Sequence, residues 1–310
     1  MNTQANALRE SSVESSATAA AAIPVSRRIY WAVRRELWEN RSIFIAPLAV
    51  GGLTLLGSLI SMVHLPARMH AAMSLDPVKQ REFIMGHYFI VSGVMMLTTL
   101  VVGIFYCLDG LYGERRDRSI LFWKSLPVSD FETVLSKMIT PVLILPLVTF
   151  GVAVIVQGIM LLVSSAVLAG SGEGVSLLWT HAAVLQTWPM LFYHLLTVHG
   201  LWYAPVYAWL LLVSAWARRA PFLWAFLPPL AIVAVEKIAF NTSHLWDVLA
   251  NRVIGGPGGE DYMANSLSMD PLMHFKPGLF FISPGLWIGL AVAAAFLALA
   301  VRVRRRGGPI

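Results

Sequence analysis

The sequence predicts an all-α membrane protein with six transmembrane helices and with both the N-terminus and the C-terminus in the cytoplasm. Of its 310 residues, 57% are hydrophobic and only 13% are charged, against roughly 45–50% and 25% in soluble domains. Several windows almost free of Asp, Glu, Lys and Arg are long enough to cross a hydrocarbon core. With six spans, 17 of the 23 lysines and arginines fall on the cytoplasmic side, which is the asymmetry typical of inner loops.

One window, from 174 to 217, fits either a single span with an extra helix or a tight hairpin of two spans. A seventh span would place Arg218, Arg219 and the basic 302–306 segment outside, so we expect one span here. Residues 175–188 then form an outer interfacial or re-entrant helix. The six expected spans are 43–63, 88–108, 140–163, 191–216, 221–240 and 284–301.

The segment before the first span divides into two parts. Residues 1–25 are mostly small and polar and lack the features of a signal peptide, which predicts a disordered cytoplasmic tail. In 26–41, Tyr30, Val33 and Leu37 share one helical face while arginines flank the other. This pattern predicts a helix lying in the plane of the inner interface; the alternative is a charged anchor without that orientation. The rest of the chain, 42–306, forms the six-span domain.

Local signals place several helix starts. Ser129 with Glu132 forms a capping-box pattern ahead of the third span. Asp76 and Ser283 each precede a proline, as at the first turn of a helix. Between spans five and six, the apolar segments within 241–282 are too short to cross a bilayer, so they are interpreted as short re-entrant helices.

Motifs for catalysis or metal binding are missing from the sequence. It contains no GxxxxGK[ST], HExxH or GxSxG pattern, so we expect no catalytic residue and no ATP hydrolysis by this chain. Cys107 is the single cysteine. His194 and His199 stand five residues apart, about 140° on an α-helix, so they should not share a metal ion. No cofactor, metal or nucleic-acid partner is expected, since the cations flank membrane spans.

Charged residues and prolines inside the spans are the next candidates. Glu236 and Lys237 lie in the outer part of span five, where they form either a gate or substrate contact or an interfacial ion pair. Pro205, Pro228 and Pro229 remove backbone donors within spans four and five. They are predicted hinges, with simple packing kinks as the alternative.

The inner loop ERRDRSILFWKSLPVS (114–129) carries a charge cluster followed by a short apolar run. Pro127 disfavours helix through Leu126, which predicts a short amphipathic helix at the cytoplasmic face. Such a helix can touch only lipid headgroups. The acidic Glu114 and Asp117 among the arginines favour a protein partner instead.

The segments 114–137 and 201–221, about a seventh of the chain, resemble ABC-2 type permeases, the transmembrane subunits of ABC transporters, and the six-span layout extends the likeness over nearly the whole chain. The resemblance implies an N-terminal elbow helix at 26–41, re-entrant helices in 241–282, and a coupling helix between spans two and three that docks on a separate ATPase. The residues expected to make or orient that contact are Glu114, Arg115, Arg116, Asp117, Phe122 and Trp123.

The resemblance also implies the partners and the setting. Two copies of the permease, as a homodimer or related heterodimer, would join two ATPase subunits that hold ATP and Mg²⁺. The assembly would export an amphiphilic substrate such as a drug, peptide, lipid or glycan across a bacterial cytoplasmic membrane. Two alternatives stay open: a secondary carrier driven by an ion gradient, and a membrane-embedded enzyme.

Overall fold

The structure, a computed structural model, describes residues 24–125, 128–171, 175, 179, 184–253 and 277–308. All regular elements within these residues are helices, with no strand among them, so the all-α prediction is confirmed for this part of the chain. The expected tail, 1–25, lies almost entirely outside the described residues. The first described helix is α2 (Val25–Glu39).

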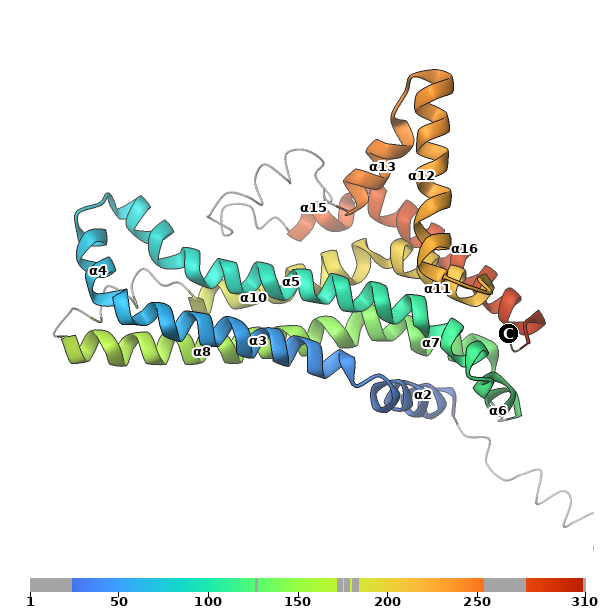
Figure 1. The fold of residues 1–310 in the computed structure, drawn as a ribbon, viewed down its shortest axis with the longest axis horizontal. Coiled ribbons are helices and arrows are strands. Elements are labelled where there is room, and N and C mark those ends of the chain that lie inside the picture. Colours follow the sequence, from blue (N-terminus) through green and yellow to red (C-terminus); the bar gives the residue numbers. More distant parts are fainter. Residues whose placement is uncertain are drawn as a thin grey trace, which may run out of the picture.

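Three long helices run side by side and form the centre of the molecule (Figure 1). They are α3 (Ser42–Ser61), α5 (Pro77–Arg116) and α8 (Leu145–Ser171). Gly51 allows α3 to approach α8 closely, because a Cβ there would lie 2.7 Å from Val152 Cγ1. At the far end, η1 (Met62–His64) and α4 (Leu65–Met73) continue from α3.

The third expected span is part of a longer helix that changes its winding. It begins as α7 (Asp130–Ile139), passes through the π-helix η2 (Thr140–Ile144), and continues as α8. Pro146 has no N–H to donate to the carbonyl of Val142, which frees this turn from α-helical bonding. The capping box at its start is confirmed: Ser129 Oγ accepts from Glu132 N at 3.2 Å, and Glu132 Oε2 accepts from Ser129 N at 2.9 Å.

The fourth expected span is broken. It consists of α10 (Val184–His194), the π-helix η3 (Leu195–Trp202) and α11 (Ala204–Trp216), with a bend of 46° between the first two elements and the third. Pro205 lies in the first turn of α11 and cannot donate to the carbonyl of Leu201. Half of the residues of the outer helix expected at 175–188 lie outside the described residues, and its last part, from residue 184, belongs to α10.

The two π-helices pack directly on each other. A Cβ added to Gly200 in η3 would lie 2.6 Å from the carbonyl oxygen of Val142 in η2. Only glycine permits so close an approach to a backbone oxygen. Wide helical turns of this kind are often found at functional sites.

The last third of the chain contains α12 (Pro221–Phe240), α13 (His244–Val253), α15 (Pro277–Ile282) and α16 (Pro284–Arg306). Helix α16 packs along α11. Figure 1 shows α12 rising steeply away from α3, α5 and α8, with α13 beside it. Ala225 is the only buried residue of α12. The short helices α13 and α15 thus lie in the described parts of 241–282, the segment expected to be re-entrant. Residues 254–276 are not among the described residues.

The helices support a multi-pass membrane protein. Five described segments are long and apolar enough to cross a bilayer, and a sixth is added if the bent pair in the fourth position counts as one span. Several of these helices continue beyond the expected spans, since polar turns lengthen them at either end. The five segments are Ser42–Ala71, Phe83–Arg116, Asp130–Ser171, Pro221–Phe240 and Pro284–Arg306.

Candidate functional site

Buried charges meet at one end of the helix bundle, where α2, α5, α7 and α16 converge (Figure 1). At the centre, Lys137 Nζ of α7 lies 2.9 and 3.0 Å from the two carboxylate oxygens of Glu36 on α2. Glu36 is 0% exposed and Lys137 is 2% exposed. The hydroxyl of Tyr106 on α5 also donates to Glu36, at 3.0 Å.

The charged contacts continue from Lys137 across the bundle. Its Nζ lies 3.1 Å from Glu114 Oε1, at the end of α5. Glu114 Oε2 accepts from Arg304 Nη1 of α16 at 2.5 Å, and Arg304 Nε donates to Asp130 Oδ1 of α7 at 3.0 Å. A chain of alternating charges therefore joins four helices that are far apart in the sequence.

Arg35 on α2 completes the set, with Nη2 at 2.6 Å from Glu36 Oε1 and 3.6 Å from Glu114 Oε1. The three cations then balance the three carboxylates, as buried charges require. These six residues are called the ion network: Arg35, Glu36, Glu114, Asp130, Lys137 and Arg304.

The network fixes the protonation of Glu36. Burial raises the pKa of this carboxyl group, but the charges of Lys137 and Arg35 outweigh burial, so its pKa lies below the ordinary value. For Arg35, burial lowers the pKa and the neighbouring Glu36 more than restores it, so its net pKa is raised. Both side chains are therefore charged at neutral pH.

Helix α6 (Ser119–Ser125) lies next to the ion network and coincides with the predicted amphipathic helix. The buried Ile120 anchors it, while Phe122 is 58% exposed. Trp123 packs edge-on against Phe122 and lies under the guanidinium of Arg35, whose Cζ is 3.9 Å from the ring centroid. One side of α6 thus contacts the network and the other side faces outward.

A second contact joins α6 to the end of the chain. Lys124 Nζ donates to the carbonyl oxygen of Gly307 at 2.7 Å and lies 3.5 Å from that of Arg305. Helices α2, α6 and the end of α16 therefore share one end of the bundle, opposite α4 (Figure 1).

The six residues proposed to contact an ATPase divide into inner and outer groups. Glu114 belongs to the ion network, and Arg115 is buried, with Nη1 and Nη2 donating to the carbonyls of Ala215 and Ala217 on the neighbouring chain segment. By contrast, Arg116 and Asp117 are exposed and pair with each other, with Nε 3.0 Å from Oδ1. The outward-facing members are thus Arg116, Asp117 and Phe122, with Trp123 partly covered.

Glu236 has a structural role in the described chain. Its Oε1 accepts from the backbone N of His244 at 2.8 Å and from Thr242 Oγ1 at 2.9 Å, and its Oε2 accepts from Leu245 N at 2.9 Å. It thereby caps the first turn of α13 from the end of α12. Lys237 is exposed and, within the described residues, forms no ion pair with Glu236.

The predicted hinges differ from one another. Pro205 lies just beyond the 46° bend between η3 and α11. Pro228 and Pro229 lie inside α12, which continues through both without a break.

The α-helical separation of about 140° expected between His194 and His199 is wrong, because the segment that joins them is the π-helix η3. Their ring centroids are 5.5 Å apart. The error came from assuming α-helical spacing, whereas a π-helix bonds over five residues and brings such residues nearly one turn apart; Tyr203 N indeed bonds to Val198 O. In the described part of the chain, no group of three metal-ligating side chains accompanies this pair.

Glu114 is the one member of the ion network that the sequence predicted as a site residue; sequence reasoning missed Arg35, Glu36, Asp130, Lys137 and Arg304. The sequence did contain a signal for Glu36. This residue stands between Val33 and Leu37, on the flank of the apolar face expected for 26–41. A carboxylate that is buried there requires a cation as its partner. Lys137 and Arg304 carried no comparable signal, since each lies among residues suited to an inner membrane interface.

The chain was compared with known proteins. No protein-family model matches it, and neither a curated protein nor a solved structure matches it.

Proposed function

We propose that this chain is the membrane-spanning permease subunit of an ATP-driven transporter of the ABC-2 type, located in a bacterial cytoplasmic membrane and exporting an amphiphilic substrate. A separate ATPase, in two copies, would supply ATP and Mg²⁺, and a second permease copy would complete the transport unit. The resemblance of 114–137 and 201–221 to that family and the multi-pass helical architecture support the proposal.

The arrangement of α6 carries the proposal. Leu121 and Phe122 are 59% and 58% exposed, close in the chain to the exposed ion pair of Arg116 and Asp117. Exposed apolar side chains within a polar rim are typical of a docking surface. The neighbouring Arg116 and Asp117 would add charged contacts that fix the orientation of the partner.

Force on α6 would reach the membrane helices by three routes. Ile120 is buried in the bundle, Trp123 packs on Arg35 of the ion network, and Lys124 bonds to the end of the chain. Because the ion network joins α2, α5, α7 and α16, a displacement of α6 would move these helices together. Nucleotide binding by the ATPase would supply the differential affinity that shifts the bundle between two states.

The rearrangement itself would occur where helical bonding is irregular. The π-helices η2 and η3 and the bend before Pro205 lie in adjoining segments, joined by the contact of Gly200 with Val142. π-Helical segments are frequent at functional sites, and hinge motions are absorbed by a few residues at the ends of elements.

The test is purification of the chain with its native neighbours, followed by measurement of ATPase co-elution and turnover. The double variant Phe122→Ala with Arg116→Ala removes exposed side chains outside the ion network, and we expect it to weaken ATPase binding about tenfold or more. The matched control is Trp38→Ala with Arg34→Ala, an exposed aromatic–arginine pair on α2, which should leave binding unchanged. Equal binding and turnover for both variants would contradict the proposal.

The same preparation separates the other two functions. A secondary carrier would transport in an ion gradient after removal of any ATPase. A membrane-embedded enzyme would turn over substrate alone and lose activity on His194→Ala or Glu236→Ala. Either result would replace the permease assignment.

A further inference from the structure

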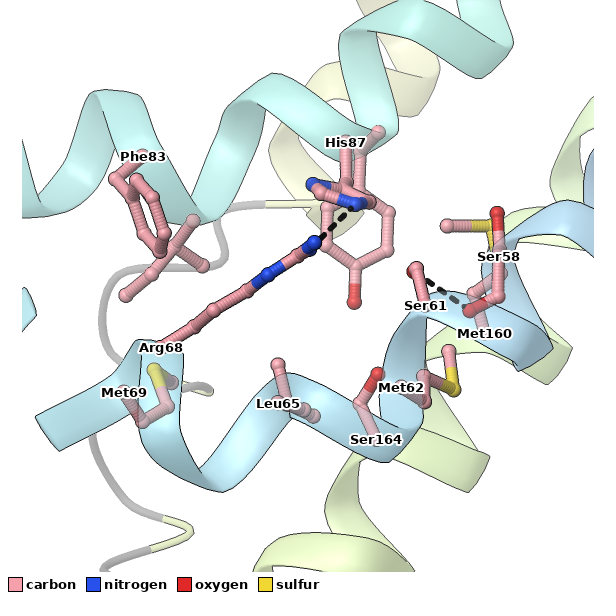
Figure 2. Close-up of a pocket in the computed structure, with 12 residues that line it drawn as sticks. Ser58, Ser61, Met62, Leu65, Arg68, Met69, Phe83, His87, Met160 and Ser164 are labelled. Carbon is pink, nitrogen blue, oxygen red and sulfur yellow. Dashed lines mark hydrogen bonds between the residues drawn. The ribbon is translucent and has the colours of Figure 1, made fainter. Parts of the chain in front are cut away.

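A small cavity lies at the opposite end of the bundle from the ion network, between the end of α3, α4, the start of α5 and the end of α8 (Figure 2). Its volume is about 50 Å³, whereas a single buried water requires roughly 10–15 Å³ by the same measure. A small polar group therefore fits inside, whereas a whole lipid or peptide does not. Under the proposed topology, this end faces the outer leaflet.

Arg68 and His87 form the polar side of the cavity. Figure 2 shows the side chain of Arg68 reaching across from α4 toward His87 on α5, and Arg68 Nη1 lies 3.3 Å from His87 Nε2. An imidazole is either neutral or cationic, so it cannot balance the guanidinium charge. Among the side chains that the structure describes, no carboxylate lies within ion-pair distance of Arg68. This cation differs from Lys137 and Arg304, which each contact two carboxylates.

Hydroxyl groups line the inner wall. Ser58 and Ser61 already donate to the carbonyls of Thr54 and Ser58, both at 2.8 Å, so they offer only acceptor atoms. Tyr88 and Ser164 are buried and also line the cavity. The acceptor oxygens of Ser58 and Ser61 add nothing to anion binding, so it is the guanidinium of Arg68, which no described carboxylate balances, that favours an oxyanion as ligand.

The remaining wall is apolar. Met62, Met69 and Met160 are buried around the cavity, and flexible methionine side chains adapt to varied apolar groups. Ile60 and Val63, next in the chain to the lining residues Ser61 and Met62, are 66% and 76% exposed. A ligand with an anionic end in the cavity could lay an apolar chain along this surface.

We propose that the cavity binds the anionic headgroup of a membrane amphiphile, with its phosphate or carboxylate on the guanidinium of Arg68, beside His87, and its apolar chain outside the cavity against α3. The inference rests on the proposed function, for which it names the substrate class. It involves none of the residues through which the ATPase would act. The binding can therefore be measured without any ATPase.

The test uses native mass spectrometry of the full chain in detergent, titrated with phosphatidylglycerol as the anionic amphiphile and phosphatidylcholine as the zwitterionic comparison. We expect one phosphatidylglycerol to be retained in preference to phosphatidylcholine. Arg68→Gln should weaken that retention about tenfold or more, because a charge-assisted contact is lost. His87→Ala should weaken it less and serves as the second variant if Arg68→Gln misfolds. Lys79→Ala, an exposed cation on the same side but outside the cavity, should bind as the wild type does.

Two outcomes overturn the inference. One is equal retention of the two lipids, or retention of phosphatidylglycerol unaffected by Arg68→Gln and His87→Ala. The other is thermal stabilisation by inorganic phosphate that disappears in Arg68→Gln while phosphatidylglycerol binds no better than phosphatidylcholine, since the ligand would then be a free oxyanion. Failure of the proposed function appears separately, as absence of ATPase co-elution from a protein that still binds the lipid.

Discussion

The ion network predicts a large loss of stability when its central cation is removed. In Lys137→Met, a side chain of similar length leaves Glu36 and Glu114 inside the bundle without the ammonium that lies 2.9–3.1 Å from both. Breaking a buried pair by removing one partner costs about 3–5 kcal/mol. Because Arg35 and Arg304 still contact the two carboxylates, we expect the lower end, about 3 kcal/mol. At about 2 °C per kcal/mol for a chain of this size, the melting temperature should fall by about 6 °C.

The assay uses a feature of this chain. Cys107 is the single cysteine and is fully buried, so a thiol-reactive fluorophore reports unfolding in detergent without any engineered label. Arg116→Met is the control, because this exposed cation should change stability by no more than about 0.5 kcal/mol. The double variant Lys137→Met with Glu36→Gln removes the stranded charge and should recover part of the loss. A melting temperature of Lys137→Met within 2 °C of the wild type would refute the reasoning, because it corresponds to a loss of only about 1 kcal/mol or less in the free energy of unfolding.

Three further predictions follow from the same contacts. The pKa of Glu36 lies below its ordinary 4.5, so the contribution of this carboxylate to folding stability is complete above pH 4.5 and is lost as the pH falls toward the folded-state pKa. The melting temperature of Glu36→Gln should therefore decrease less on acidification than that of the wild type. Gly200→Ala places a Cβ 2.6 Å from Val142 O and should cost about 1–3 kcal/mol in thermal unfolding, whereas Gly158→Ala, with open space at its Cβ, should be neutral or stabilising. Glu236→Ala removes the cap of α13 and should cost about 0.5–2 kcal/mol while leaving ATPase turnover intact; lost turnover at unchanged stability would favour the gate interpretation instead.

The positions of the apolar helices were predictable because a bilayer sets their minimum length. The first expected span, 43–63, compares with α3 at Ser42–Ser61, and the fifth, 221–240, coincides with α12. The capping box at Ser129 was equally local, since its two hydrogen bonds connect residues three apart. The true lengths were less predictable: α5 runs for 40 residues, because nothing in an apolar window limits how far a helix continues into polar sequence.

The interior of the site could not be predicted from local pattern. Glu36 and Lys137 are separated by 101 positions, and a helical face shows which side is apolar but not which distant cation meets it. The mixture of acidic and basic residues in 114–118 indicated a contact surface. In the structure, however, Glu114 and Arg115 are buried, because α7, α16 and the end of α11 supply their partners. The spacing of His194 and His199 failed for a different reason: winding was assumed to be regular next to Pro205.

The proposed function requires α6 to face the cytoplasm, where an ATPase can reach it. In a Cys107→Ser background, Phe122→Cys places one exposed thiol on α6, and Leu75→Cys places one at the opposite end, between α4 and α5. A membrane-impermeant maleimide applied to intact cells should label Leu75→Cys and leave Phe122→Cys unlabelled until inside-out vesicles are prepared. Labelling of Phe122→Cys from outside intact cells would contradict the proposed topology and, with it, the role assigned to α6.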